Sequence, residues 1–143
     1  MQKFNIIIPI YNEEDNVQII YQQITKLDIY KNIKIIFIDD GSTDNSLNII
    51  RGICNKDKKV NLISFSKNFG HQIALSAGID NSIADATIMM DADLQHPVEY
   101  IPKMINEFNN KNDVVQMVKI QQGKRNFFIR AFSFLFYYLF RKI

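Results

Sequence analysis

Two aspartates separated by one alanine form the most chemically suggestive string in this sequence of 143 residues. Asp91 and Asp93 follow the apolar Met89 and Met90, and Gln95 lies two residues further on. Like charges this close repel one another, and burying either carboxylate alone would be costly. A divalent cation such as Mg²⁺ or Mn²⁺ removes both problems, because it prefers carboxylate, carbonyl and water oxygens. Such a cation could in turn hold a diphosphate, whereas a surface turn with two solvated aspartates is the simpler alternative.

Runs of apolar, β-branched residues alternate along the chain with segments of helical spacing. We predict strands over Phe4–Ile10, Lys34–Asp39, Val60–Ser66, Ala86–Met90 and Asp113–Val118. Continuous apolar runs of this length are typical of strands that are buried on both faces, as in a parallel sheet. Strands that alternate with helices in this way indicate a single α/β domain with a mostly parallel sheet and right-handed crossovers.

Helices are predicted between the strands from apolar residues spaced three or four positions apart. Their apolar faces are expected to carry Val17, Ile20, Ile24 and Leu27 in the first helix, Leu47, Ile50 and Ile53 in the second, and Ile73, Ala77 and Ile83 in the third. A fourth helix is expected over Pro102–Asn109, because proline suits the first turn of a helix.

Composition places the chain among ordinary globular proteins, with 47% apolar and 22% charged residues. The formal net charge of +2 is unevenly distributed, since residues 114–143 hold six Lys and Arg and no acidic residue, and the rest is net acidic. The single Cys54 excludes an internal disulfide and fits a reducing compartment. No basic stretch or cleavage site precedes the first strand, so we expect no signal peptide.

Polar and acidic residues follow the ends of several predicted strands. They are Tyr11 and Glu13 after the first strand, Asp39 and Asp40 at the end of the second, the aspartate pair after the fourth, and Lys119 after the fifth. The carboxyl ends of parallel strands meet at one edge of the sheet, where ligands of such folds bind. Neither G-x-G-x-x-G nor G-x-x-x-x-G-K-[ST] occurs in the chain. Acidic residues with a metal are then the remaining means of holding a nucleotide diphosphate.

Four segments together resemble glycosyltransferases of family 2, which have the GT-A fold. They read IPIYNEEDNV, IIFIDDGSTDNS, SKNFGHQIALSAGID and MMDADLQHPVE, in this order. The resemblance covers essentially the whole chain and is closest to the polyprenyl-phosphate sugar transferases. It implies a Rossmann-like, mostly parallel sheet flanked by helices. It also implies an inverting, metal-dependent transfer of a sugar from a UDP- or GDP-linked nucleotide sugar to a polyprenyl phosphate.

The resemblance implies a nucleoside pocket at the ends of the first two strands. The residues that would line it are Pro9, Tyr11 and Glu13, with Ile38 and Asp40 contacting the base or the ribose, a task that Asp39 could share. Considered without the family, Tyr11 is a packing aromatic and Glu13 is a favourable charge at a helix N-terminus.

The diphosphate and its metal would be held by the segment around the aspartate pair. The resemblance implies that Asp91, Ala92 and Asp93 bind the diphosphate and that Asp93 is catalytic. It further implies that Asp91, Asp93 and Gln95 bind Mg²⁺ or Mn²⁺. Considered without the family, Gln95 is a solvated turn residue, and His96 is either a metal ligand or a helix cap.

The family also shares the loop that holds Asn68, Gly70 and His71. We expect Gly70 to serve the turn and His71 to form a hydrogen bond at the start of the helix rather than to act in catalysis. Lys119 would contact the nucleotide sugar where the family usually has arginine, and lysine keeps the charge but loses the bidentate fork.

Residues 123–143 differ from the rest in being both basic and aromatic. We therefore divide the chain into a nucleotide-sugar-binding domain over residues 1–122 and a basic aromatic amphipathic helix over residues 123–143. Its uncharged stretch Ala131–Phe140 would measure about 15 Å as a helix, half of the roughly 30 Å hydrocarbon thickness, so it is too short to span a membrane. We expect residues 124–143 to lie on the membrane surface at the cytoplasmic face, with their basic ends at anionic headgroups.

Other interpretations of these features stay open. The aromatic segment could instead pack on a further part of the enzyme or on a second subunit of a homo-oligomer. We expect no nucleic acid as partner, because no RNA-module motif accompanies the basic residues. Members of the family continue past the position of Ile143, so we interpret the chain as the donor half with only the start of the acceptor half.

The alternative functions are a family 2 transferase that extends a cell-surface glycan and an inactive nucleotide-sugar-binding fragment that lacks the acceptor half. A phosphorylation receiver domain also has an acidic pocket and a lysine, which Asp39, Asp40 and Lys119 resemble. We reject it, because receivers carry the acidic pair after the first strand and not after the second.

Overall fold

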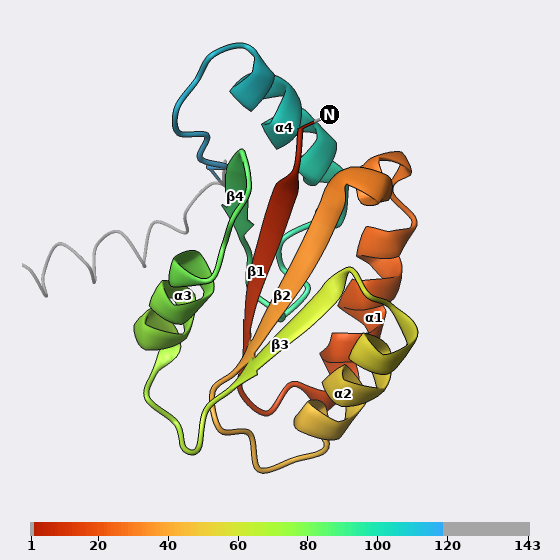
Figure 1. The fold of residues 1–143 in the computed structure, drawn as a ribbon, viewed down its shortest axis with the longest axis vertical. Helices are drawn as coiled ribbons and strands as arrows, with labels where there is room; N and C mark the ends of the chain where they lie inside the picture. The colour runs from red at the N-terminus through yellow and green to blue at the C-terminus, as the bar shows by residue number, and fades with distance from the viewer. Residues whose placement is uncertain (1, 119–143) are drawn as a thin grey trace, which may run out of the picture.

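The structure is a computed structural model that describes residues 2–118 (Figure 1). Within these residues one sheet has the strand order β3-β2-β1-β4. Its strands are β1 (Phe4–Ile10), β2 (Ile33–Asp39), β3 (Val60–Ser64) and β4 (Ala86–Met89). All neighbouring strands in the sheet are parallel, as the continuous apolar runs predicted. The carboxyl ends of the strands therefore meet at one edge of the sheet.

Helices lie on both faces of the sheet and give three layers (Figure 1). They are α1 (Glu14–Thr25), α2 (Ser46–Lys56), α3 (His71–Asp80) and α4 (Ile101–Asn109), with short 3₁₀ helices η1 (Asp28–Asn32) and η2 (Val98–Tyr100). Helices α1, α2 and α4 contribute to the hydrophobic cluster on one face, and α3 contributes Ala74 to the cluster on the other. The two clusters enclose the sheet from opposite sides.

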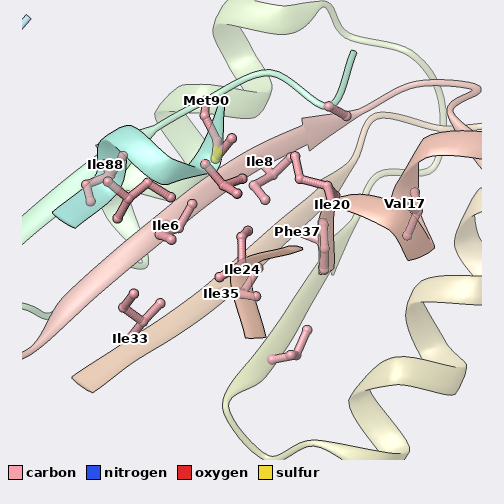
Figure 2. Close-up of a cluster of buried hydrophobic side chains, with 14 of the residues drawn as sticks. Ile6, Ile8, Val17, Ile20, Ile24, Ile33, Ile35, Phe37, Ile88 and Met90 are labelled. Carbon is pink, nitrogen blue, oxygen red and sulfur yellow. The ribbon is translucent and has the colours of Figure 1, made fainter. Parts of the chain in front are cut away.

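The side chains of β1 alternate between these two clusters, as expected for a strand buried on both faces. Ile6 and Ile8 belong to the larger cluster, whereas Ile7 belongs to the cluster under α3. Figure 2 shows Ile6 and Ile8 near Ile20 and Ile24 of α1. All seven residues of β1 are buried, so this central strand is fixed by packing on both faces.

Helix α3 contacts the sheet mainly through small residues, with the half-buried Leu75 and Ala77 beside them, and not through the expected Ile73 and Ile83. Ala74 and Gly78 are its buried residues, while Ile73 is 50% exposed and Ile83, beyond the helix, is 93% exposed. Small side chains let the helix axis approach the strands closely. The prediction was therefore wrong for Ile73 and Ile83, because the contact depends on a close approach at Ala74 and Gly78.

The predicted fifth strand, Asp113–Val118, does not form in the described part of the chain, which ends there without regular structure. Residues 113–117 lie beside β4 and line a hollow of about 440 Å³ with it, but they do not pair with it. Val114 and Val118 are 85% and 76% exposed, so they bury little apolar surface. This burial does not offset the conformational entropy that is lost when a strand becomes ordered. The sheet consequently ends at β4 within residues 2–118.

Several expectations lie outside the described residues. They are the contact of Lys119, the domain boundary between residues 122 and 123, and the basic aromatic helix over residues 123–143. Among residues 2–118, none of the helices combines the length and the apolar character that a membrane crossing requires.

Candidate functional site

A cavity of about 400 Å³ lies at the carboxyl edge of the sheet. Residues at or just after the end of every strand line it. They are Pro9, Ile10, Tyr11 and Glu13 for β1, Asp40 for β2, Asn68, Gly70 and His71 for β3, and Asp91–Asp93 for β4. In the sheet, β2 and β3 lie on one side of β1, and β4 lies on the other side. Such a reversal of strand order is where open α/β sheets bind their ligands.

The turn after β1 is tied to the turn after β2 by hydrogen bonds. Asn12 has a left-handed backbone with φ of 56°, which asparagine tolerates better than most residues. Its side-chain Oδ1 accepts from the backbone N–H of Thr43 at 2.8 Å, and its own N–H donates to Ser42 Oγ at 3.1 Å. These bonds hold Tyr11 and Glu13 at the mouth of the cavity.

Asp44 joins the N-termini of two helices. Its carboxylate accepts from the backbone N–H of Glu14 in α1 and of Ser46 in α2, each at 3.0 Å. Partial burial alone would raise the pKa of Asp44, but these hydrogen bonds outweigh it and lower the pKa. The charged carboxylate therefore holds together the two helix ends that flank the cavity.

Tyr11 and Glu13 both line the cavity. Tyr11 is 47% exposed, so its ring is available to a ligand and is not a packing aromatic. One carboxylate oxygen of Glu13 accepts from Asn16 Nδ2 at 2.6 Å, and the Glu13 N–H donates to Ser46 Oγ at 2.9 Å. The position of Glu13 is thus set by α1 and α2 together.

The two aspartates at the end of β2 have different surroundings. Asp39 accepts from the Ser42 N–H and from Ser64 Oγ, both at 3.3 Å, and stabilises the turn below the cavity. Asp40 lines the cavity, and its carboxylate accepts from the backbone N–H of Phe69 at 2.7 Å and of Gly70 at 2.9 Å. Of the two, Asp40 is therefore the one that borders the cavity.

Ile38 lies in the core and not in the cavity wall. Its side chain is fully buried in the cluster with Ile7, Ile36 and Ala74. Any contact of this residue with a nucleoside would therefore have to come from its backbone.

The segment after β4 places the aspartate pair at the opposite wall. Asp91 and Asp93 line the cavity with Ala92, which is itself buried. Asp93 Oδ1 accepts from the backbone N–H of Gln95 at 2.9 Å. The intervening Leu94 has φ of 59°, a left-handed conformation that is uncommon for a bulky residue and that tends to occur at functional sites.

Two imidazoles flank the carboxylate of Asp91. His71 Nε2 lies 3.6 Å from Asp91 Oδ1, and His96 Nδ1 lies 3.8 Å from Asp91 Oδ2. His71 also lines the cavity, whereas His96 faces the hollow beside α4. The sequence did not single out His71 for the site. Its place directly after the β3 loop, at the same sheet edge, is the signal that could have found it.

The cavity wall is acidic. Among its lining residues are four carboxylates, those of Glu13, Asp40, Asp91 and Asp93, and there is no Lys or Arg among the lining residues that the structure describes. An anionic diphosphate would be repelled here unless a cation were bound between it and the carboxylates.

The aspartate pair fits a hard divalent cation. Asp91 is about half exposed, and the hydrogen bond to Gln95 leaves Asp93 one oxygen that it does not use. Within residues 2–118 there is no group of three His, Cys, Asp or Glu side chains arranged to hold a metal. Mg²⁺ commonly binds through one or two carboxylates, with substrate phosphates and water completing its coordination. The residues present therefore fit a metal that is shared with a diphosphate.

Comparison with known proteins identifies the class. The profile of the family described as "Glycosyl transferase family 2" matches residues 5–142. The chain therefore belongs to glycosyl transferase family 2, as the motifs around Tyr11, Asp40 and Asp91 indicated.

Two named relatives show which members of the family this chain is similar to. The chain is 37% identical over 139 residues to a Bacillus subtilis protein named "uncharacterized glycosyltransferase YkcC", covering 96% of this chain and 43% of that protein. It is 34% identical over 143 residues to the bactoprenol glucosyl transferase of Shigella phage SfX, covering 99% of this chain and 47% of that protein. The chain thus spans less than half the length of these relatives.

Solved glycosyltransferases share the fold. Residues 1–349 of Staphylococcus aureus TarS in complex with UDP-GlcNAc superimpose with a TM-score of 0.66 at 20% identity, covering 85% of this chain and 36% of that chain. The mannosyltransferase PcManGT of Pyrobaculum calidifontis, in complex with GDP-Man and Mn²⁺, gives 0.59 at 21% identity, covering 64% of this chain and 28% of PcManGT. The sheet and its helices therefore have the GT-A architecture of these enzymes.

Proposed function

We propose that this chain carries the donor-binding half of an inverting, metal-dependent glycosyltransferase. In this proposal the sugar moves from a UDP- or GDP-linked nucleotide sugar to a polyprenyl phosphate. The relatives named bactoprenol glucosyl transferase support the lipid acceptor, and the structural neighbours solved with UDP-GlcNAc or GDP-Man support the donor class.

The acidic cavity at the carboxyl edge is the observation that carries the proposal. Its carboxylates lie on opposite walls, with Glu13 and Asp40 on one side of the β1–β4 switch point and the aspartate pair on the other. A volume of about 400 Å³ falls in the range of small-molecule sites. A nucleotide sugar combines a planar base, whose face Tyr11 can contact, with a diphosphate that needs a cation.

Asp91, Asp93 and Gln95 are the residues that would hold Mg²⁺ or Mn²⁺. When bound, such an ion acts as a Lewis acid that neutralises the leaving diphosphate. A metal is also present in the solved complex of PcManGT with GDP-Man and Mn²⁺. Because Asp93 is fixed by the Gln95 N–H, it is the carboxylate that we assign to catalysis at the leaving group.

The chain's own residues would bind and orient the donor. Pro9, Tyr11 and Glu13 would border the nucleoside together with Asp40 at the end of β2, whereas Ile38 could contribute only through its backbone. A polyprenyl phosphate is already ionised at neutral pH, so its oxygen can attack without a general base. Positioning and charge stabilisation are then sufficient for the transfer.

A thermal-shift panel tests the donor assignment. UDP- and GDP-sugars are added with Mn²⁺ or with EDTA, because a ligand that binds the native state raises its stability by mass action. We expect either the UDP-sugars or the GDP-sugars to raise the unfolding temperature with Mn²⁺ and not with EDTA. Equal stabilisation in EDTA would contradict the metal-dependent site, and no response to any nucleotide sugar would contradict the donor-binding function.

The membrane assignment rests on residues outside the described structure. We propose that residues 124–143 attach the enzyme peripherally to the inner face of the cell membrane and that Lys119 approaches the donor phosphates. In a flotation experiment with anionic vesicles, the full chain should float with the vesicles, whereas a variant without residues 124–143 should not. A matched variant with the five basic residues of this segment changed to Gln should show weaker binding that depends less on salt. Equal flotation of all three proteins would contradict the assignment.

A further inference from the structure

The loop between β3 and α3 is held by a carboxylate from a different strand. Asp40, at the end of β2, is only 3% exposed. Its two oxygens accept separately from the consecutive backbone N–H groups of Phe69, at 2.7 Å, and of Gly70, at 2.9 Å. Hydrogen bonds to a charged acceptor are about twice as strong as neutral ones. The carboxylate thus fastens the backbone of this loop at two adjacent points.

The residue after Asp40 brings the same two segments into direct contact. Gly41 has φ of 71°, and a Cβ atom there would meet the backbone carbon of Lys67 at 2.4 Å and the backbone nitrogen of Asn68 at 2.7 Å. The turn after β2 therefore lies against the loop with no room for a side chain. Within the loop itself, Phe65 and Phe69 pack edge to face at 5.6 Å between ring centroids.

The fastened loop leads directly to His71, which lies beside Asp91. Gly70 ends the loop and His71 begins α3, where its Nε2 lies 3.6 Å from Asp91 Oδ1. Asn68, Gly70 and His71 line the same cavity as the aspartate pair, and of the three His71 is the one that lies beside Asp91. The position of His71 relative to Asp91 is therefore set from the end of β2.

We propose that Asp40 is a positioning residue: its carboxylate fastens the loop over residues 65–70 and, through the loop, places His71 beside Asp91. This role differs from a contact with the base or the ribose, because it acts on the diphosphate end of the cavity. The consequence for ligand binding rests on the proposed function, whereas the fastening of the loop is a property of the free protein.

The fastening is tested on the full chain without ligand. In the wild type, NMR should detect scalar couplings across the hydrogen bonds from the Phe69 and Gly70 amides to the Asp40 carboxyl carbon. In Asp40→Asn, the amide group offers one acceptor oxygen and turns an NH₂ toward the second N–H. We expect amide hydrogen exchange at Phe69 or Gly70 to become at least about tenfold faster, the scale set by losing one hydrogen bond to a charged group.

Two references make this result specific. The Ile35 amide, which donates to Lys59 O far from the loop, should keep its protection in Asp40→Asn and so report an intact fold. Tyr11→Phe changes the cavity wall without touching the loop amides, and it should leave exchange at Phe69 and Gly70 unchanged. Absent couplings in the wild type, or unchanged exchange at both amides in Asp40→Asn, would overturn the proposal.

Inorganic pyrophosphate with Mn²⁺ separates positioning from a nucleoside contact, because this probe has no base or ribose. Asp40→Asn and His71→Ala should each weaken calorimetric binding of Mn²⁺-pyrophosphate. Tyr11→Ala should weaken binding of whichever of UDP and GDP the wild type binds, but not binding of pyrophosphate. Unchanged pyrophosphate affinity in Asp40→Asn would restrict Asp40 to the nucleoside and refute the positioning role. If the wild type bound neither probe, the proposed function would fail, while the exchange result would still decide the fastening.

Discussion

Gly78 of α3 lies so close to Ile7 of β1 that a Cβ atom on Gly78 would meet Ile7 Cγ2 at 2.5 Å. The same atom would meet Ile38 Cδ1 at 2.9 Å. Gly78→Ala should therefore push α3 away from the sheet and lower the free energy of unfolding by about 1–3 kcal/mol, the usual cost of overpacking a core. Chemical denaturation measures this change.

Gly52→Ala is the matched control, because Gly52 lies inside α2 with no atom within 4 Å of its added Cβ. Alanine is the better helix former, so this variant should be more stable by up to about 1 kcal/mol. Equal effects of the two substitutions would mean that α3 does not approach β1 as closely as described.

Gly41→Ala should be among the most damaging glycine substitutions in this chain. Its added methyl would meet the backbone of Lys67, which cannot move as a flexible side chain can, and φ of 71° adds strain. We expect a loss of more than about 2 kcal/mol in unfolding free energy, together with altered amide shifts at Lys67 and Asn68. A stability equal to that of the wild type would contradict the contact between the two turns.

Gly70→Ala provides the comparison, because Gly70 also has a positive φ, of 99°, but its added Cβ would point into open space. This variant should show the cost of backbone strain alone, about 1–3 kcal/mol, without displacement of Lys67. The shifts of Lys67 then separate steric displacement from strain.

Asp57 lies at the C-terminal end of α2, away from the cavity, and it should make the free energy of unfolding depend on pH. Burial alone would raise the pKa of Asp57, but hydrogen bonds from the Tyr30 hydroxyl, the Lys59 N–H and the Tyr21 hydroxyl outweigh it and lower the pKa. A carboxyl whose pKa is lower in the folded state stabilises the fold above its unfolded pKa. That contribution disappears as the pH falls through the folded value.

Asp57→Asn should accordingly lower the unfolding free energy at pH 7 by about 1–3 kcal/mol, as expected for lost hydrogen bonds to a charged group. The difference from the wild type should shrink below about pH 4, where the unfolded carboxyl becomes protonated. Asp28→Asn, at an exposed position in η1, should change stability by less than about 0.5 kcal/mol. A difference for Asp57→Asn that stays constant between pH 7 and pH 3 would count against this hydrogen-bonded cluster.

The sheet could be predicted from the sequence because its strands are continuous apolar runs with clear ends. β1 was predicted with its observed bounds, and β2, β3 and β4 within one or two residues. The residues through which α3 packs on the sheet could not be predicted in this way. Ala74 and Gly78 were missed because a helix that approaches a sheet closely uses small residues, which carry little apolar signal.

The candidate site was predictable to the extent that it follows directly from strand ends. Tyr11, Glu13, Asp40 and the aspartate pair lie around one cavity because each comes immediately after a parallel strand. The hydrogen bonds of Asp40 to the loop after β3, and the approach of His71 to Asp91, join residues 20 to 30 positions apart in the sequence. Such contacts depend on how loops pack and leave no local pattern.

The central claim is that Asp91 and Asp93 bind a divalent cation and that this cation binds the diphosphate of the donor. The most direct test is calorimetric titration of UDP and GDP into the wild type, Asp91→Asn and Asp93→Asn, each with Mn²⁺ and with EDTA. Unfolding midpoints of the three proteins check that each is folded. We predict that the wild type binds one nucleotide only with Mn²⁺ and that each variant binds it at least about tenfold more weakly, a loss of 1.4 kcal/mol or more. Binding that is equal in all three proteins, or that survives EDTA, would contradict the claim.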